Sequence, residues 1–230
     1  MKTFKAISAL LSYPTPELQG AAGALRAAID GDNLVSPAMR RQLDTLIDDI
    51  ATGDLYDLQE RYVLLFDRTR SLSLHLFEHM HGESRDRGQA MIDLKALYEK
   101  SGLLISVAEL PDFLPLLLEF LSTQPFSEAR ETLGQTVHIL SALAERLRKR
   151  QSPYEAALRA LVAIAAAKPT VEAVAALLDE PDSDPTDLAA LDEAWADEPV
   201  TFGPTASNCK DGIIAHIRAA KRPPPASPEA

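Results

Sequence analysis

The densest group of side chains able to do acid–base or metal chemistry lies in residues 62–88, YVLLFDRTRSLSLHLFEHMHGESRDRG. Within it, His75 and His79 frame an H-x-x-E-H pattern, the order found in a class of zinc hydrolases. On a helix these two histidines would share one face, and Glu78 would lie beside them as a general base. A catalytic zinc needs a third protein ligand, and no later helix offers a His or Glu in a suitable setting. The pattern does not favour a metal site, and both a partner-binding surface and a polar corner of a helical core remain open.

Length and composition limit the classes of protein to which this chain can belong. The 230 residues fit one domain of ordinary size plus a tail, and 46% hydrophobic residues with only 10 glycines favour a helical fold with a real core. The net charge of −11 argues against nucleic acid or an anionic membrane as a main partner. The single cysteine excludes an internal disulfide, and no apolar run has the length of an export signal or a membrane span. These features predict a cytoplasmic protein with no stable membrane association.

Apolar residues at helical spacing, with Ser, Thr or Asp start signals, predict a single all-α domain over residues 1–180. The expected helices cover residues 4–11, 15–29, 36–50, 54–66, 85–101, 112–121, 133–150, 152–167 and 171–178. Residues 71–76 alternate like a strand, but the sequence contains no second strand pattern to pair with them. We therefore expect a helix there, or a helix preceded by a turn.

Three local signals lead to specific predictions about the ends of helices. Asp112 is expected to cap the helix that carries Pro115 in its first turn. Ser152 is expected to open a later helix through a capping box. The cations of residues 146–150 suit the negative end of a helix dipole, so they need no nucleic-acid role.

The C-terminal part of the chain has a different composition. Residues 179–198 contain nine acidic residues and neither Lys nor Arg, and prolines gather after residue 222. This composition predicts that residues 181–230 form an acidic, Pro-rich, largely disordered tail, with room for a short helix near residues 188–195.

The residues alone thus predict an acidic, all-helical domain with no assembled active site and no cofactor of its own. For such a domain the default role is binding, through a groove between helices that accepts a partner helix. A generic helical adaptor is therefore one function to consider, and a zinc hydrolase is the weakest of the alternatives.

A longer pattern in the same stretch resembles a known family. Residues 62–68, 71–79 and 81–91 (YVLLFDR, SLSLHLFEH and HGESRDRGQAM) resemble the signature of the NarJ family, the assembly chaperones of respiratory nitrate reductase. Residues 109–121, ELPDFLPLLLEFL, resemble a second signature that is shared more loosely with the TorD-like chaperones of molybdoenzymes. The similarity covers most of the chain, to about Phe202.

This resemblance implies an all-helical cytoplasmic chaperone rather than an enzyme. Such a chaperone binds the N-terminal segment of the catalytic (alpha) subunit of respiratory nitrate reductase as a helix. It holds that subunit open while the molybdenum cofactor, and an iron–sulfur cluster, are inserted. It also delays docking onto the membrane subunit until loading is complete, and it is not part of the final enzyme. In this family the H-x-x-E-H pattern is not a zinc site.

We therefore expect a partner-binding groove with an apolar lining and a polar rim. The expected lining consists of Tyr62, Leu65, Phe66, Leu72, Leu76, Phe77, Leu114 and Leu118. The expected rim consists of His75, His79, Glu109, Asp112 and Glu119. Plain core packing is the alternative for the apolar residues, and for Leu65, Phe66 and Leu118 it is at least as favoured. Two rim histidines, with an ordinary pKa of about 6.5, would make partner binding sensitive to pH.

Overall fold

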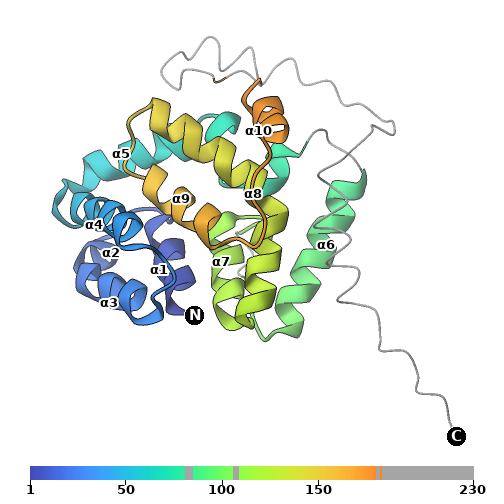
Figure 1. Ribbon diagram of the computed structural model, residues 1–230, viewed down its shortest axis with the longest axis horizontal. Coiled ribbons are helices and arrows are strands. Elements are labelled where there is room, and N and C mark those ends of the chain that lie inside the picture. The colour runs from blue at the N-terminus through green and yellow to red at the C-terminus, as the bar shows by residue number, and fades with distance from the viewer. Residues whose placement is uncertain (81–84, 106–108, 180–181, 183–230) are drawn as a thin grey trace, which may run out of the picture.

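The computed structural model describes residues 1–80, 85–105, 109–179 and 182. Over these residues the chain forms ten α-helices and two short 3-10 helices, and its only strand-like pairing there is one isolated bridge (Figure 1). The elements are α1 Lys2–Leu10, α2 Pro16–Gly20, α3 Ala22–Asp32, α4 Pro37–Thr52, α5 Leu55–Phe66, η1 Arg70–Leu72, η2 Leu76–His79, α6 Arg85–Lys100, α7 Leu114–Thr123, α8 Phe126–Lys149, α9 Glu155–Ile164 and α10 Val171–Leu178. The predicted all-α fold is confirmed.

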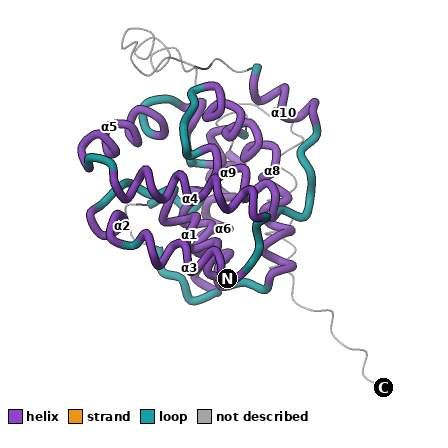
Figure 2. The backbone as a smooth tube through the Cα atoms, turned by 60° about the vertical axis from the view of Figure 1, so that its left-hand side comes forward, coloured by secondary structure: helices purple, strands orange, loops and turns teal. Residues whose placement is uncertain are grey.

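The long helix α8 is the centre of the arrangement. Helix α9 folds back along α8 as a helical hairpin, and α10 packs on α8 as well. Helix α1 packs against both α7 and α3, and α4 connects the two groups by packing on α3 and α9. Helix α5 lies at the edge of the molecule in both views (Figures 1 and 2).

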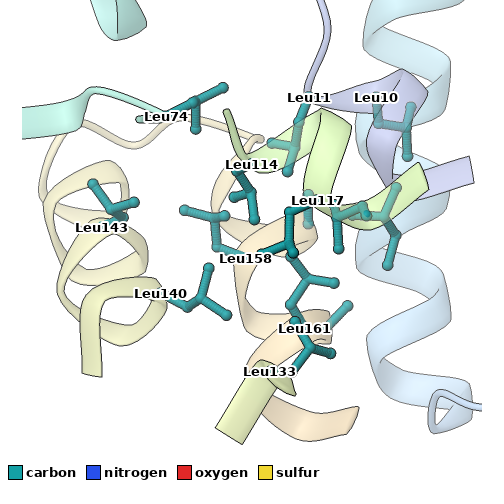
Figure 3. Close-up of a cluster of buried hydrophobic side chains, with 14 of the residues drawn as sticks. Leu10, Leu11, Leu74, Leu114, Leu117, Leu133, Leu140, Leu143, Leu158 and Leu161 are labelled. Atoms are coloured by element: carbon teal, nitrogen blue, oxygen red, sulfur yellow. The ribbon is translucent and has the colours of Figure 1, made fainter. Parts of the chain in front are cut away.

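Leucines from four helices meet in the core (Figure 3). Leu10 on α1, Leu117 on α7, Leu140 on α8 and Leu158 on α9 are all buried. Leu74, which comes from a loop, points into the same cluster (Figure 3). Burying one leucine side chain stabilises the fold by about 1.5–3 kcal/mol, so this shared cluster holds together helices that are far apart in sequence.

The N-terminal caps of three helices are as predicted. The side chains of Thr15, Ser36 and Asp54 each accept a hydrogen bond from a backbone N–H in the first turn of α2, α4 and α5. The expected single helix over residues 15–29 is wrong, because the helix is interrupted at Ala21, which separates α2 from α3. Helix α3 ends at Asn33, whose φ of 49° is a left-handed conformation that Asn tolerates.

The capping box expected at Ser152 does not form. Gln151 adopts a φ of 53°, and the backbone N–H of Ser152 turns back to the Leu147 carbonyl at 3.0 Å to close the end of α8. The residue before α9 is instead Tyr154, which makes no side-chain cap hydrogen bond. A sequence signal for a helix start was overridden here by the termination of the preceding helix.

The expected short helix near residues 188–195, and almost all of the acidic tail, lie outside the described residues. Among the helices that the structure does describe, none is both long enough and apolar enough to cross a membrane.

Candidate functional site

The middle part of the stretch that carries the first family resemblance is not an α-helix. We call residues 69–80 the signature segment; it contains η1, an extended stretch and η2. The expected helix at residues 71–76 is therefore wrong. Leu72, Leu74 and Leu76, whose alternation resembled a strand, are 0–2% exposed. Leu72 ends η1 and Leu76 begins η2, and Leu74 between them points into the core (Figure 3).

The signature segment pairs with the loop that precedes α7, about 40 residues further along the chain. His75 and Phe113 form an isolated antiparallel bridge. The backbone N–H of Leu76 donates to the Asp112 carbonyl at 3.1 Å, and that of Leu114 donates to the Leu74 carbonyl at 2.8 Å. The sequence showed no second strand pattern to pair with residues 71–76. The segment that pairs with them is the short loop before α7, which has no strand pattern of its own. This pairing joins the two sequence signatures.

Asp112 has a different role from the cap predicted for it. Phe113 occupies the N-cap position of α7 without a side-chain cap hydrogen bond, while the Asp112 side chain is fully buried. Its carboxylate accepts a hydrogen bond from the Phe77 N–H at 3.0 Å and faces His75 Nδ1 at 3.3 Å. The hydrogen bond to Asp112 is the main cause of a raised pKa at His75. Asp112 points back at the signature segment because the bridge places the Phe77 N–H beside it.

The two histidines of the H-x-x-E-H pattern face different partners. His75 reaches Asp112, whereas His79 is 5% exposed and donates from Nε2 to the Ser73 carbonyl at 2.7 Å. The shared helical face imagined for a zinc site does not exist, because the residues between them are in a 3-10 turn. In the part of the chain that the structure describes, no group of three or more His, Cys, Asp or Glu is placed to hold a metal.

Arg146 supports the signature segment from α8. It is 1% exposed, and its guanidinium donates to the carbonyls of Ser71 and Leu177, each at 2.7 Å. Arg146 lies in the last turn of α8, as the helix-dipole interpretation expected, but it is buried and bonds to groups outside α8. The signal that reveals it is spacing, since Arg146 lies three residues after the buried Leu143 on the same stripe.

A second contact connects the start of the tail to the same place. The Asp182 carboxylate accepts hydrogen bonds from Ser71 Oγ and from the Arg150 guanidinium, both at 2.7 Å. The chain after α10 is thus attached to η1 by a hydrogen bond and to the end of α8 by an ion pair.

The structure buries most of the expected groove. The eight expected lining residues, Tyr62, Leu65, Phe66, Leu72, Leu76, Phe77, Leu114 and Leu118, are all between 0 and 8% exposed, as the core-packing alternative predicts. Of the expected rim, the side chain of His75 is partly exposed, and Glu109 and Glu119 are exposed. The expected position of His79 and Asp112 on a solvent-facing rim is wrong, because each is held inside by a backbone hydrogen bond.

Aromatic rings connect α5 to the rest of the domain. Tyr62 donates from its hydroxyl to the Leu11 carbonyl at 2.9 Å, and its ring contacts Tyr13, Phe66 and Tyr154. Burial raises the pKa of Tyr62, with further contributions from Tyr154, Glu109 and Asp67. Burial also raises the pKa of Tyr154, to about 12. Both phenols therefore stay neutral and act as packing groups.

Over the described residues the fold is a helical domain in which the two sequence signatures pack on each other. Residues 32–160 match the family model described as "Nitrate reductase delta subunit". The chain is 40% identical over 212 residues to the nitrate reductase molybdenum cofactor assembly chaperone NarJ of Escherichia coli K12, which is 92% of this chain and 89% of that protein. The chain belongs to this family.

Two further relatives support this assignment. One is the probable nitrate reductase molybdenum cofactor assembly chaperone NarW of E. coli K12, 39% identical over 88% of this chain and 84% of that protein. The other is the probable NarJ chaperone of Bacillus subtilis strain 168, 34% identical over 70% of this chain and 86% of that protein. The relatives are named as assembly chaperones, not as catalysts.

Proposed function

We propose that this chain is an assembly chaperone of nitrate reductase that supports insertion of the molybdenum cofactor and is not an enzyme. The observation that carries the proposal is the match to a protein named for this role, which covers 92% of this chain. Its partner is the catalytic subunit of the reductase. The chaperone acts in the cytoplasm, holds no cofactor of its own and does not remain in the finished enzyme.

We further propose that the chaperone binds the N-terminal segment of the apo catalytic (alpha) subunit as a helix. Helix binding suits a domain that is itself built from packed helices. While bound, the chaperone keeps the subunit open for molybdenum cofactor and iron–sulfur insertion and delays docking at the membrane. A chaperone must also release its client, so a dissociation constant of about 1 μM, corresponding to about −8 kcal/mol, is expected.

The proposed contact region is the outer side of the signature segment and of the loop before α7. His75, Glu109 and Glu119 are the members of the expected site that reach solvent. The buried lining residues hold this surface in place from beneath. They contact the client directly only if the helices part, because their side chains already fill the core.

The test is co-purification from cells that express the catalytic subunit with its first residues present or deleted. We expect the full-length subunit to be retained by the tagged chaperone and the deleted form to be lost. Equal retention of both forms would contradict binding at the N-terminal segment. Normal reductase maturation in cells that lack the chaperone would contradict the chaperone role itself.

Binding is expected to depend on pH through His75, whose side chain is partly exposed and whose pKa is raised mainly by its hydrogen bond with Asp112. Calorimetric titration of a synthetic client peptide at about pH 6 and about pH 8 measures this. The control is His75→Asn, which cannot titrate. Equal affinity of the unsubstituted protein at both pH values would remove His75 from recognition.

We propose that residues 1–180 form the chaperone domain and that residues 181–230 form a separate acidic tail. The tail either reaches a second site on the large client or keeps the protein soluble. A chain truncated after Pro181 distinguishes these roles: reduced cofactor insertion indicates client contact, and unchanged insertion with poorer solubility indicates the second role.

A further inference from the structure

The chain that leaves the α8–α9 hairpin runs back along α8 towards the C-terminal end of that helix. Near the start of α8, Arg130 Nε donates to the Ile164 carbonyl at 2.8 Å. Further along α8, the backbone N–H of Thr170 donates to His138 Nδ1 at 3.2 Å. Helix α10 then packs on α8, and the Arg146 guanidinium holds its last turn. These contacts follow α8 in order, so the path brings the residues after α10 to the end of α8.

Cations gather at this end of α8. Arg148 and Lys149 are exposed, and Arg150 occupies the C-cap position with 20% of its side chain exposed. We call Arg148, Lys149 and Arg150 the cationic end. Glu145 pairs with Arg148 at 2.8 Å, and Glu155 also acts on Arg148. Lys149 has no ion pair within the part of the chain that the structure describes. The cationic end therefore keeps an exposed positive charge.

The last described residue of the chain already lies on the cationic end. Asp182 accepts hydrogen bonds from the Arg150 guanidinium and from Ser71 Oγ, both at 2.7 Å. Residues 183–198, which we call the acidic segment, contain six acidic residues and neither Lys nor Arg. Asp184 and Asp187 follow Asp182 by two and five residues, which an extended chain spans in about 7 Å and about 17 Å. Neighbouring residues of α8 are about 1.5 Å apart along its axis, so both carboxylates come within reach of the cationic end.

We propose that the cationic end of α8 is a docking site for the acidic segment of the same chain, with Asp184 or Asp187 paired with Lys149. Exposed ion pairs are individually weak. Here, however, Asp182 is already fixed on Arg150, so the next pairs form at the high effective concentration of a tethered group. Because η1 shares the Asp182 carboxylate, the docked segment is held beside the signature segment. This docking needs no client and goes beyond the proposed function.

Zero-length cross-linking with a carbodiimide tests the contact in the full-length chain. The reagent joins a lysine amine to a carboxylate that touches it, and mass spectrometry of the monomeric product identifies the joined peptides. We expect Lys149 to be joined to Asp184 or Asp187 at least about fivefold more often than Lys5, an exposed lysine on α1. The yield at Lys149 should fall at least about threefold in about 1 M salt, where the screening length is about 3 Å. A yield at Lys149 no higher than at Lys5, or cross-links between two copies only, would overturn the proposal.

A charge swap tests the same contact without a cross-linker. Trp195 is the single tryptophan of the sequence and lies in the acidic segment, so the anisotropy of its fluorescence reports how freely the segment moves. Arg148→Glu with Lys149→Glu should lower this anisotropy at least about 1.5-fold, because the segment is then repelled from the end of α8. Adding Asp184→Lys with Asp187→Lys should restore it, because the charges are complementary again.

The matched control is Lys5→Glu with Lys95→Glu, which makes the same change of net charge at exposed positions on α1 and α6. It should leave the anisotropy of Trp195 within about 10% of that of the unsubstituted chain, since distant exposed charges are screened. Unchanged circular dichroism is expected throughout, because the substituted positions on α1, α6 and α8 are at the surface. Docking at the cationic end is overturned if the control lowers the anisotropy as much as the swap does, or if the second charge reversal fails to restore it.

Discussion

The α8–α9 hairpin and the signature segment are both buried, but they are stabilised in different ways. In the hairpin, backbone groups bond within each helix, and the contact between helices is made by apolar side chains such as Leu140 and Leu158. In the signature segment, several buried residues are polar, and the backbone bonds outward, to the loop before α7 and to Arg146. The hairpin is therefore determined mainly by local sequence, whereas the signature segment depends on groups from other parts of the chain.

This difference bears on function. The irregular segment keeps the outer sides of His75 and Phe113 available while its leucines are held in the core. A regular helix in the same place would present a repeating surface and could not join the two sequence signatures through a single bridge. The polar contacts that replace helical bonding are the parts most sensitive to substitution.

The largest effect is expected at Arg146, which belongs to α8 but supports the signature segment. Arg146→Ala leaves the buried carbonyls of Ser71 and Leu177 without their donor and should lower the free energy of unfolding by about 3–5 kcal/mol. Urea denaturation of the variant and of the unsubstituted protein measures this loss of free energy of unfolding. Arg148→Ala removes an exposed arginine paired with Glu145 and should cost less than about 0.5 kcal/mol. Similar losses for the two variants would mean that Arg146 does not support the segment.

A comparison of leucines tests whether the two regions share one core. Leu140→Ala on α8 and Leu74→Ala in the signature segment should each cost about 2–5 kcal/mol, because both side chains are buried in the cluster of Figure 3. Leu104→Ala, at a side chain that is 89% exposed, should change stability by less than about 0.5 kcal/mol. A loss at Leu74 as small as that at Leu104 would show that the segment is not packed into the core.

Asp112→Ala should show whether the signature segment can open locally while the rest of the domain stays folded. It removes the buried acceptor of the Phe77 N–H and the partner of His75, at a cost of about 1.5–3 kcal/mol, and Asp112→Asn should cost less because it keeps an acceptor oxygen. Hydrogen exchange should speed up more at Phe77 than at the amides in the middle of α8. Equal acceleration at both places would argue against a locally held segment.

The smallest expected effect is the pH dependence that His75 confers on stability. Its pKa is raised in the folded state, mainly by the hydrogen bond with Asp112, so its contribution is complete below the ordinary value of about 6.5 and is lost as pH rises through the folded-state pKa. The free energy of unfolding of the unsubstituted protein, relative to that of His75→Asn, should therefore fall between about pH 6 and about pH 8. A constant difference between the two proteins would mean that His75 is not protonated against Asp112.

Much of the fold was predictable because its signals are local. Thr15, Ser36 and Asp54 cap helices as expected, since a cap involves only neighbouring backbone groups. The expectations for Asp112 and Ser152 were wrong because each has a competing partner, the signature segment for Asp112 and the end of α8 for Ser152. A short-range rule does not take account of such partners.

For the candidate site, the sequence located the two stretches that matter but not which of their side chains face outward. The alternation of Leu72, Leu74 and Leu76 marked three buried positions, but only the residues between Leu72 and Leu76 are extended, and the bridging partner at Phe113 carries no strand signal. The position of Arg146 on a buried stripe was visible in its spacing, but its acceptors on η1 and α10 were not.

By itself, the sequence determined the helical class, most helix boundaries, the acidic charge and the family, because these follow from periodicity, caps, composition and the two signatures. Only the tertiary structure decided that the signatures meet, that Asp112 and His79 face inward, and that Tyr13, Glu109 and Leu110 face outward. The physical reason is that burial of a polar group depends on whether a distant residue supplies its hydrogen bond, and only the folded chain brings the two together.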